Sequence, residues 1–585
     1  MISSSFRRTA LITAMAGLVG LMAGGTAWIL LHLIALITNA AVFGRLGFHP
    51  PSFAELHPSP RLVIVACLGA LAISLLAKWS PVIRGHGIPE AMEAVLTKQS
   101  RIAPRTAIAK PLSAAIAIGT AAPFGAEGPI IVTGGALGSL LGQIVPVTPS
   151  ERKILLACGA AAGMSATFGA PLASVILAIE LLLFEFSARA LVPLVVATGV
   201  AGGVHNSLFG SGPLFAVPAH NYRGLAGLPA FVLLGLACGL LAVGLTQGLF
   251  VVERMYRRLP IGEFWHPVIG AALFATVGLA APRALGVGYD AIGDVLNSRL
   301  ALGTVAVLGL VKLIAWWLAL GSGTSGGTLA PILLISASFG TLFGAGVNHV
   351  VPGAHVAPGA FALVAMAATF GASTRATFTA IVFVFELTRD YQVVVPLMLA
   401  TVLADLVFNA LSEHSIMTEK LSHRGLRIGR HYGVDPFTTY TVAQIMTSPV
   451  DTLAASATVS DARGRFLKGG HSAYPIVTID QSVVGIVTRS DLLADDLDED
   501  APVVEHGSLD VVSVGPQDSA MAALHVMLDE RVEHVPVMAD GHLVGICTRS
   551  DLLKVRQDQR DHEWAPQRRI AAGRLARGGR VAKPK

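Results

Sequence analysis

Gly125-Ala126-Glu127-Gly128-Pro129 is a glycine-rich turn that carries a single carboxylate. Glu127 is the one charged residue between positions 111 and 150. A carboxylate near the centre of a bilayer costs about 2.5–3.5 kcal/mol on insertion scales, so it is a functional candidate. Such a glutamate could instead satisfy free N–H groups at a helix start. The flanking glycines favour a functional role, because they let a ligand approach the backbone closely.

The composition around this turn is typical of a membrane protein that crosses the bilayer several times. Of the 585 residues, 53% are hydrophobic and 14% are charged, and soluble proteins have about 25% charged residues. Residues 9–44 and 224–252 contain no Asp, Glu, Lys or Arg. A helix needs about 20 apolar residues to cross a bilayer core. Because the first stretch is far longer than the apolar region of a secretory signal, we expect no cleaved signal.

The sequence divides into an apolar part, residues 1–412, and a part of ordinary soluble composition. Many apolar segments are short and interrupted by Gly or Pro, which membranes tolerate where the backbone lines a cavity. Several motifs recur after about 200 residues. The matching pairs are Thr167–Ala170 with Thr369–Ala372, Gly85–Gly87 with Gly286–Gly288, and Pro129 with Pro331. We predict two repeats, about 60–210 and 265–412, with the functional site at their interface.

The soluble part also repeats. The run GIVTRSDLL at 485–493 recurs as GICTRSDLL at 545–553. A β-rich run precedes each copy, so each predicts an α/β unit of strand, strand, turn and helix. The boundaries that we predict are a linker at 413–440, the first copy at 441–497, the second at 502–556 and a basic tail at 557–585.

Charge and cysteine placement limit the partners. Arg7 and Arg8 precede the first apolar segment, which favours a cytoplasmic N-terminus. We expect the basic tail to face solvent or lipid headgroups in the cytoplasm and to bind no nucleic acid. The four cysteines show no paired spacing, so neither disulfides nor a metal site is expected.

Three glycine-rich turns, at 85–89, 125–129 and 321–331, precede apolar segments. Each would leave free N–H groups at a helix start, and these bind anions without a Lys or Arg. One such turn alone would be explained by close packing through small residues. Three together favour an anion site.

These motifs resemble those of the CLC family of chloride channels and chloride/proton antiporters, over residues 1–425. Gly85–Pro89 resembles the family's GSGIP turn, Gly125–Pro129 its GREGP turn and Gly326–Pro331 its GGIFAP turn. The soluble copies resemble a tandem pair of CBS domains. The resemblance implies a polytopic all-α membrane protein of two inverted repeats of broken, tilted helices, followed by a cytoplasmic α/β CBS pair. It also implies a homodimer in the cell membrane with one chloride pore per subunit.

The resemblance assigns roles to individual residues. Glu127 is expected to be the gating glutamate, and the N–H groups of Thr328 and Leu329 are expected to hold the central anion. The full set of expected anion-binding residues is His86, Gly87, Ile88, Gly125, Ala126, Gly128, Thr328, Leu329 and Met417.

Three positions depart from the family pattern. His86 replaces a serine, Leu329 replaces a phenylalanine and Met417 replaces the pore tyrosine. A neutral histidine can donate one N–H in place of the serine hydroxyl, whereas methionine cannot donate. The sequence therefore does not determine how the inner gate is built or which small anion is selected.

A fourth departure concerns protons. Antiporters of the family carry a second glutamate, and its position falls on Leu181, which cannot titrate. Glu180 lies one residue earlier and so points about 100° away on a helix, whereas Glu185 lies about one turn further on. We therefore expect passive or weakly proton-coupled chloride transport, with Glu127, Glu180 and Glu185 as the candidate proton path. A strict chloride/proton antiporter is the alternative.

In the soluble copies, Thr488 with Asp491 and Thr548 with Asp551 match the Thr-x-x-Asp signature of nucleotide-binding CBS domains. The resemblance implies an adenine nucleotide there, while helix capping by the aspartate explains the same pattern.

Two other functions fit the sequence less well. A cation transporter needs several oxygen ligands together, but the membrane acidic residues are scattered through the sequence. An enzyme needs a nucleophile, base or metal motif, and the sequence shows no such cluster. We expect no catalytic residues, no metal site and no required cofactor.

Overall fold

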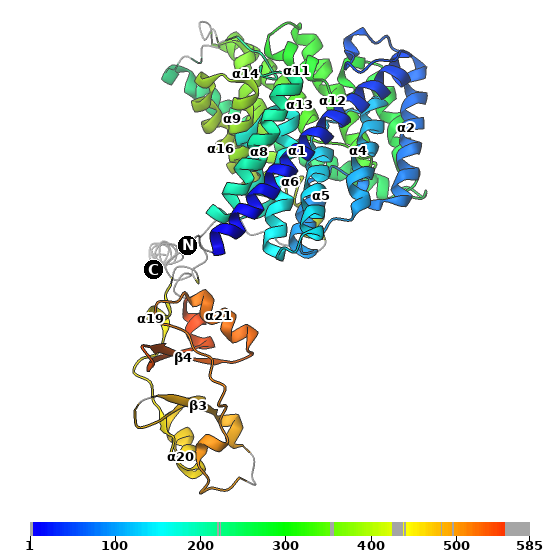
Figure 1. Cartoon of the computed structure of the whole chain (residues 1–585). Coiled ribbons are helices and arrows are strands. Elements are labelled where there is room, and N and C mark those ends of the chain that lie inside the picture. The colour runs from blue at the N-terminus through cyan, green and yellow to red at the C-terminus, as the bar shows by residue number, and fades with distance from the viewer. Residues whose placement is uncertain are drawn as a thin grey trace, which may run out of the picture. The chain divides into compact units, whose positions relative to one another are not determined.

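The computed structural model describes residues 4–218, 222, 224–351, 356–423, 437, 440–480, 482–493 and 497–555. The chain forms two compact units, Met1–Tyr432 and Gly433–Lys585. The first is helical and the second mixes helices and strands (Figure 1). The expected basic tail at 557–585 lies outside the described residues, as does most of the expected linker.

The first unit is the membrane unit, and its described elements are helices. The α-helices are α1 (Ser4–Thr38), α2 (Pro60–Trp79), α3 (Ile88–Thr97), α4 (Pro104–Gly119), α5 (Glu127–Ile144), α6 (Pro149–Phe168), α7 (Pro171–Ala178), α8 (Ala188–Phe209), α9 (Gly224–Arg257), α10 (His266–Gly278), α11 (Tyr289–Leu296), α12 (Leu302–Gly321), α13 (Leu329–Val350), α14 (Pro358–Thr374), α15 (Thr377–Thr388), α16 (Val394–Leu411) and α17 (Glu419–His423). The short π and 3-10 segments are η1 (Asn39–Phe43), η2 (Phe53–Glu55), η3 (Pro81–Ile83), η4 (Ile179–Leu183), η5 (Pro282–Ala284) and η6 (Tyr391–Val393). The helix α17, in the range expected as linker, belongs to this unit.

Seven of the described helices are long and apolar enough to cross a membrane, namely α1, α2, α8, α9, α12, α13 and α16. The first of them, α1, runs obliquely across the unit in Figure 1. A 35-residue helix is about 52 Å long at 1.5 Å per residue, well over the ~30 Å core, so tilt is required.

Shorter helices are broken where the sequence predicts breaks. Helix α6 ends at Gly169, whose φ of 62° favours glycine, and Pro171 opens α7. The eight-residue α7 then passes into the π-helical η4. A left-handed residue, Arg375, likewise separates α14 from α15 in the second repeat. The membrane unit therefore has the interrupted helices that cavity-lining backbone requires.

Each repeat contributes a glutamate that accepts hydrogen bonds from a helix start in the other repeat. Glu180 in η4 accepts hydrogen bonds from the backbone N–H groups of Phe378 and Thr379, which start α15. Glu386 near the end of α15 accepts from those of Leu172 and Ala173, which start α7. When each of two matching segments makes the same contact to the other, the pair has two-fold symmetry. The repeats therefore pack around a local pseudo-two-fold axis.

The second unit contains two small sheets. The first has the order β1-β2-β3, with β1 (Leu453–Ala454) parallel to β2 (Ala473–Val477) and β2 antiparallel to β3 (Val483–Thr488). The second pairs β4 (His534–Ala539) with β5 (His542–Thr548) in antiparallel register. The remaining described elements are α19 (Val442–Ile445), α20 (Val459–Gly469), η7 (Arg489–Leu492), η8 (Val503–Glu505) and α21 (Ala520–Asp529).

Each soluble copy has its own hydrophobic core. The boundary between the two copies is not a single position in the sequence. Val442 of α19 is buried with Val535 and Val537 of β4, in the core of the second copy. Thr447 also pairs with Ile546 of β5 through backbone hydrogen bonds. The segment that we assigned to the start of the first copy thus completes the second.

Candidate functional site

Three helix starts meet at one small cavity in the membrane unit. Helices α3, α5 and α13 begin at the three glycine-rich turns, as the sequence predicts. The cavity leaves about 10 Å³ for the centre of a water-sized molecule, which is room for about one small occupant. Its lining residues are Ile88, Glu127, Gly128, Ile131, Met164, Phe168, Leu177, Leu181, Thr328, Leu329, Phe370 and Met417.

The turns are joined by their backbones. The N–H of Gly125 donates to the carbonyl of Gly327 at 3.2 Å, and the N–H of Gly327 donates back at 2.9 Å. Gly85 and Ser325 form an isolated parallel β-bridge. A Cβ atom on Gly128 would clash with the carbonyl oxygen of His86. Glycine is therefore needed here so that three helix N-termini can converge on one point.

Glu127 lies where the turns meet, and 2% of it is exposed. Its Oε1 accepts a hydrogen bond of 3.0 Å from the hydroxyl of Tyr289. Its Oε2 is buried and has no hydrogen-bond partner among the described residues. The backbone N–H groups of Glu127 itself and of Ala330 act on its charge, so the N-termini of α5 and α13 both favour the carboxylate.

The carboxylate occupies the space that glycines leave open. A Cβ atom on Gly125 would overlap Glu127 Oε2, and one on Gly327 would lie 2.5 Å from it. The Glu127 carboxylate thus sits over both turns, where converging N–H groups would otherwise hold a free anion. The carboxylate therefore lies where helix N-termini favour a negative charge.

Sequence reasoning missed Tyr289. It is the first residue of α11 and follows the Gly286–Gly288 turn, which the sequence marks as the counterpart of Gly85–Gly87. The repeat was a usable signal, since it predicts that this turn also lies at the repeat interface. The hydroxyl of Tyr289 is the one side-chain donor that the described residues offer to Glu127.

Sequence reasoning also missed two buried lysines, 202 positions apart, that support the turns. Lys110 on α4 donates from Nζ to the carbonyls of Ile83 and Gly85, both at 2.8 Å. Lys312 on α12 donates to the carbonyls of Gly286 and Val287 at 2.7 and 3.3 Å. Both lysines are fully buried. Each ammonium therefore holds the glycine turn of its own repeat.

The three departures from the family pattern lie in or beside the cavity. Leu329 and Met417 line it and are 5% and 0% exposed. His86 lies in the neighbouring turn, is 3% exposed, and its Nδ1 has no hydrogen-bond partner among the described residues. Thr328 carries the one hydroxyl in the lining. Backbone N–H groups therefore supply most donors that an anion would find.

The structure does not bring the three glutamates of the candidate proton path together. Leu181 lines the cavity with Glu127, whereas the Glu180 carboxylate is directed to α15 by bonds of 3.0–3.1 Å to backbone N–H groups. Glu185 is exposed and follows η4. No titratable residue other than Glu127 is in the described lining.

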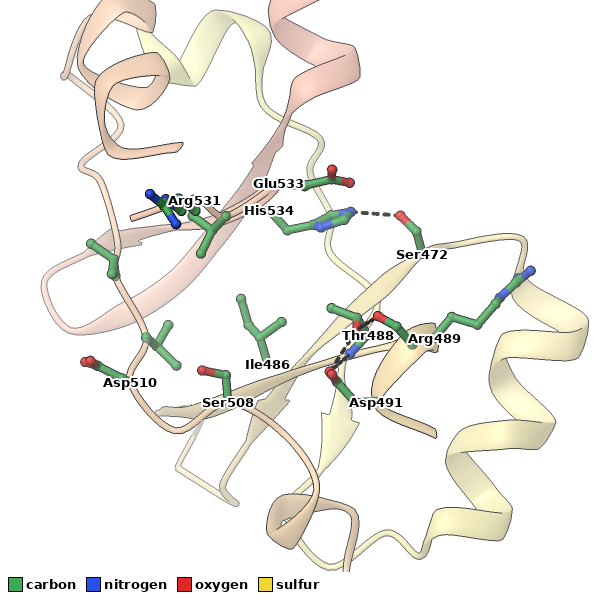
Figure 2. A pocket seen from close by; sticks show the side chains of 14 residues that line it. Ser472, Ile486, Thr488, Arg489, Asp491, Ser508, Asp510, Arg531, Glu533 and His534 are labelled. Carbon is green, nitrogen blue, oxygen red and sulfur yellow. Dashed lines mark hydrogen bonds between the residues drawn. The ribbon is translucent and has the colours of Figure 1, made fainter. Parts of the chain in front are cut away.

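A second cavity lies between the two soluble copies (Figure 2). It leaves about 420 Å³ for the centres of water-sized molecules and includes Thr488 and Asp491 from the first copy and Arg531 and His534 from the second. The N–H and hydroxyl of Thr488 both donate to Asp491 Oδ2 at 2.8 Å. Figure 2 also shows the 2.8 Å hydrogen bond between His534 Nε2 and Ser472 Oγ, which joins the copies. Burial lowers the pKa of His534 below its usual value.

The matching signature in the second copy is closed. The N–H and hydroxyl of Thr548 donate to Asp551 Oδ2 at 3.0 and 2.7 Å. Lys554 Nζ donates to Asp551 Oδ1 at 2.9 Å. Asp551 is 2% exposed and does not line the second cavity. Of the two signatures, the structure therefore brings only Thr488 and Asp491 to this cavity.

Residues 68–409 match the family model of the voltage gated chloride channel, and residues 442–497 and 504–558 match that of the CBS domain. The chain belongs to the CLC family. The expected fold class is confirmed: a helical CLC membrane unit precedes a CBS pair that contains small sheets. Its place as a multi-pass membrane protein follows from the same match and from the seven long apolar helices.

Similar proteins include channels and exchangers by name. A ClcB-like protein of Ralstonia nicotianae, named as a chloride channel, is 29% identical and covers 61% of this chain and 83% of its own. An H(+)/Cl(-) exchange transporter ClcA of Yersinia pestis is 30% identical, covering 68% of this chain and 84% of its own. A slow cyanobacterial Cl-/H+ antiporter has the same membrane fold, with a TM-score of 0.62, 24% identity and coverage of 71% of this chain and 98% of its own.

Proposed function

We propose that this CLC protein exchanges chloride for protons across the membrane and that Glu127 carries the proton. The observation that carries the proposal is the buried Glu127 carboxylate, which lies over two anion-binding turns in a cavity shared by both repeats. Several relatives are named H(+)/Cl(-) exchange transporters, including ClcA proteins of Vibrio and Yersinia. They favour the strict antiporter over the passive transport that the sequence led us to expect.

The geometry supports competition between the carboxylate and chloride. Ionised Glu127 is itself an anion, and it is stabilised by Tyr289 and by the N-termini of α5 and α13. When Glu127 takes up a proton, it loses that attraction, and chloride can take the space. One group then alternates between holding a proton and blocking the anion. Since protonation opens the path, chloride flux should rise as pH falls.

Passive chloride transport remains the second candidate because of one observation. Leu181 lines the cavity at the position where the family resemblance places a proton-carrying glutamate. A leucine there removes that route for protons, although it does not affect the anion path.

Purified protein in liposomes distinguishes the two functions. A chloride gradient is applied at equal pH on both sides, and chloride and pH electrodes record both fluxes. Exchange predicts uphill proton movement at a constant ratio to chloride. Chloride flux without proton movement would contradict exchange and support the passive function.

We also propose that the CBS pair regulates transport by binding an adenine nucleotide. The cavity in Figure 2 supports this, because it offers the Asp491 carboxylate for hydroxyl groups and Arg531 for a phosphate. Only one of the two signatures contributes to it, so we expect one nucleotide per chain at this place. Calorimetry with ATP, ADP and AMP on the purified chain tests the proposal.

The assembly and orientation that the resemblance implies are proposals as well. Each chain contains all the lining residues of its own anion cavity, which is consistent with a homodimer of two separate pores. Arg7 and Arg8 before α1 support a cytoplasmic N-terminus, and we place the C-terminus on the same side. Mass measurement in detergent tests the dimer, and labelling of cysteines introduced at each end tests the orientation.

A further inference from the structure

The α1–α2 loop, residues 44–59, is a long connection with a fixed path. Asn39, just before it, donates from Nδ2 to the carbonyls of Gly47 and His49 at 3.1 and 2.8 Å. Arg45 Nε in turn donates to Asn39 Oδ1 at 3.0 Å. Connections longer than about 12–15 residues are uncommon in compact domains, and the ordered ones are often functional.

The middle of the α1–α2 loop is seated on the turn that opens α11. Phe53 is 8% exposed, and a Cβ atom on Gly286 would lie 2.6 Å from Cε2 of its ring. The ring therefore packs directly on the glycine backbone. Ser52 Oγ donates to Asp290 Oδ2 at 2.5 Å. The loop thus contacts both ends of the segment 286–290.

The same turn is also held from within the membrane unit. Lys312 Nζ donates to the carbonyl of Gly286 at 2.7 Å. The N–H of Gly286 donates to the carbonyl of Ala121 at 3.2 Å. With the loop on one side and these bonds on the other, Tyr289 has a defined position at the start of α11.

Packing leaves the Tyr289 hydroxyl directed at the carboxylate. The ring makes T-shaped contacts with Phe168 and Phe215, at centroid distances of 6.3 and 6.2 Å, and such contacts favour one ring orientation. The hydroxyl donates to Glu127 Oε1 at 3.0 Å. Tyr289 and Asp290 are neighbours in one helix, so the bond from Ser52 to Asp290 bears on the place of this hydroxyl.

Few groups determine the charge of Glu127. Besides backbone N–H groups, Tyr289 from α11 and Lys312 from α12 act on it. The described lining of the cavity contains no other titratable residue. A hydrogen bond to a carboxylate favours its ionised form. Loss or displacement of the Tyr289 hydroxyl should therefore let Glu127 take up a proton at higher pH.

We propose that Ser52 and Phe53 are positioning residues for Glu127, because they hold the α11 turn where Tyr289 reaches the ionised carboxylate. The α1–α2 loop then sets the pH at which Glu127 takes up its proton and leaves the anion position to chloride. With the N-terminus in the cytoplasm, the loop lies on the outer side, since α1 is long and apolar enough to cross the membrane. The inference rests on the competition between Glu127 and chloride proposed above.

The test is the pH of half-maximal chloride flux, recorded from liposomes with the full chain between pH 5 and 8. Tyr289→Phe retains the ring but loses the donor, so this midpoint should rise by about one unit. The control is Tyr222→Phe, which loses a hydroxyl that donates to Asp390 Oδ2 at 2.8 Å. It should leave the midpoint unchanged.

Ser52→Ala should raise the midpoint in the same direction, by about half a unit. Its matched control is Ser59→Ala in the same loop. Both hydroxyls accept a bond from a backbone N–H two residues on, at 3.1 Å for Ser52 and 3.3 Å for Ser59. Of these two, only Ser52 donates to Asp290, so Ser59→Ala should keep the wild-type midpoint.

The double variant tests whether Ser52 acts through Tyr289. If it does, adding Ser52→Ala to Tyr289→Phe should cause no further rise. An unchanged midpoint in Ser52→Ala, or a rise that adds fully to that of Tyr289→Phe, would overturn the inference. A lower flux at every pH with the wild-type midpoint would also overturn it, because Ser52 would then only stabilise the fold.

Glu127→Gln separates this inference from the proposed function. If flux depends on pH in the unmodified chain but not in Glu127→Gln, the role of Glu127 stands whatever Ser52→Ala shows. If flux through the unmodified chain does not respond to pH, the role of Glu127 and this inference fail together.

Discussion

The first and second repeats of the membrane unit share the same supports but differ in their reactive side chains. Lys110 and Lys312 hold equivalent turns, and Glu180 and Glu386 cap each other's neighbouring helix. At the start of α5, however, the first repeat carries Glu127, while the start of α13 carries Leu329. The residue between the turn glycines is His86 in one repeat and Val287 in the other.

The shared side chains support the duplicated fold, whereas the side chains that differ are the reactive ones. Both repeats supply helix N-termini to one cavity, and helix N-termini favour small anions. Only the first repeat supplies a titratable residue to the described lining, namely Glu127. If the chain exchanges chloride for protons as we propose, anion binding belongs to the symmetric frame and proton handling to one repeat.

The soluble copies show a similar asymmetry. Asp491 faces a cavity, whereas Asp551 is held by Lys554. The residue that corresponds to Lys554 in the first copy is Ala494, which cannot form such an ion pair. The two matching signatures thus differ both in access and in this ion pair.

The largest effect should come from removing the reactive group of the first repeat. Glu127→Gln cannot ionise, so proton flux should fall about 100-fold or more and the pH dependence of chloride flux should vanish. Leu329→Met at the equivalent position should leave the ratio of the two fluxes unchanged. Electrode recordings from liposomes between pH 5 and 8 measure both. Wild-type pH dependence in Glu127→Gln would contradict the role of this residue.

The buried lysines test whether the frame is symmetric. Lys110→Met and Lys312→Met each leave two buried carbonyls without their ammonium donor, which should cost about 1–3 kcal/mol of unfolding free energy. Thermal unfolding in detergent should show similar losses for both variants. A large loss in one variant alone would show that the two turns are not equivalent supports.

The two CBS signatures can be compared by nucleotide affinity. Asp491→Asn should weaken binding about tenfold, which corresponds to about 1.4 kcal/mol. Asp551→Asn should have little effect, because its carboxylate does not line the cavity. Calorimetry on the purified chain measures both affinities. Equal binding by both variants would remove these carboxylates from the site, and no heat with any adenine nucleotide would leave capping as the function of both motifs.

The smallest effect should come from Glu180 and Glu386, the glutamates that cap a helix in the opposite repeat. Glu180→Gln and Glu386→Gln retain one acceptor oxygen but lose the charge that favours a helix N-terminus, at a cost of about 0.3–1 kcal/mol each. Both should lower thermal stability slightly and leave the flux ratio unchanged. A change of ratio in Glu180→Gln would return this residue to the proton path, and Glu185→Gln extends the same test to the exposed carboxylate.

Much of the architecture was accessible from local sequence. Apolar stretches, glycine-rich turns and Pro at helix starts predicted the broken membrane helices, and two internal repeats predicted the duplicated units. The three turns that the sequence singled out do meet at one cavity, with Glu127, Thr328, Leu329 and Met417 in its lining. These features depend on residues close together in the chain, where composition and backbone preference act directly.

Other features were decided only by tertiary structure. Tyr289 reaches Glu127 across 162 positions, and Glu180 caps a helix about 200 positions away. The segment at Val442 completes the second soluble copy, and Asp551 is buried and accepts a hydrogen bond from Lys554. The sequence contains all these residues but does not show which of them are in contact. Such contacts form only when packing brings separate elements together, because a polar group buried by that packing must find its partner wherever the fold places one.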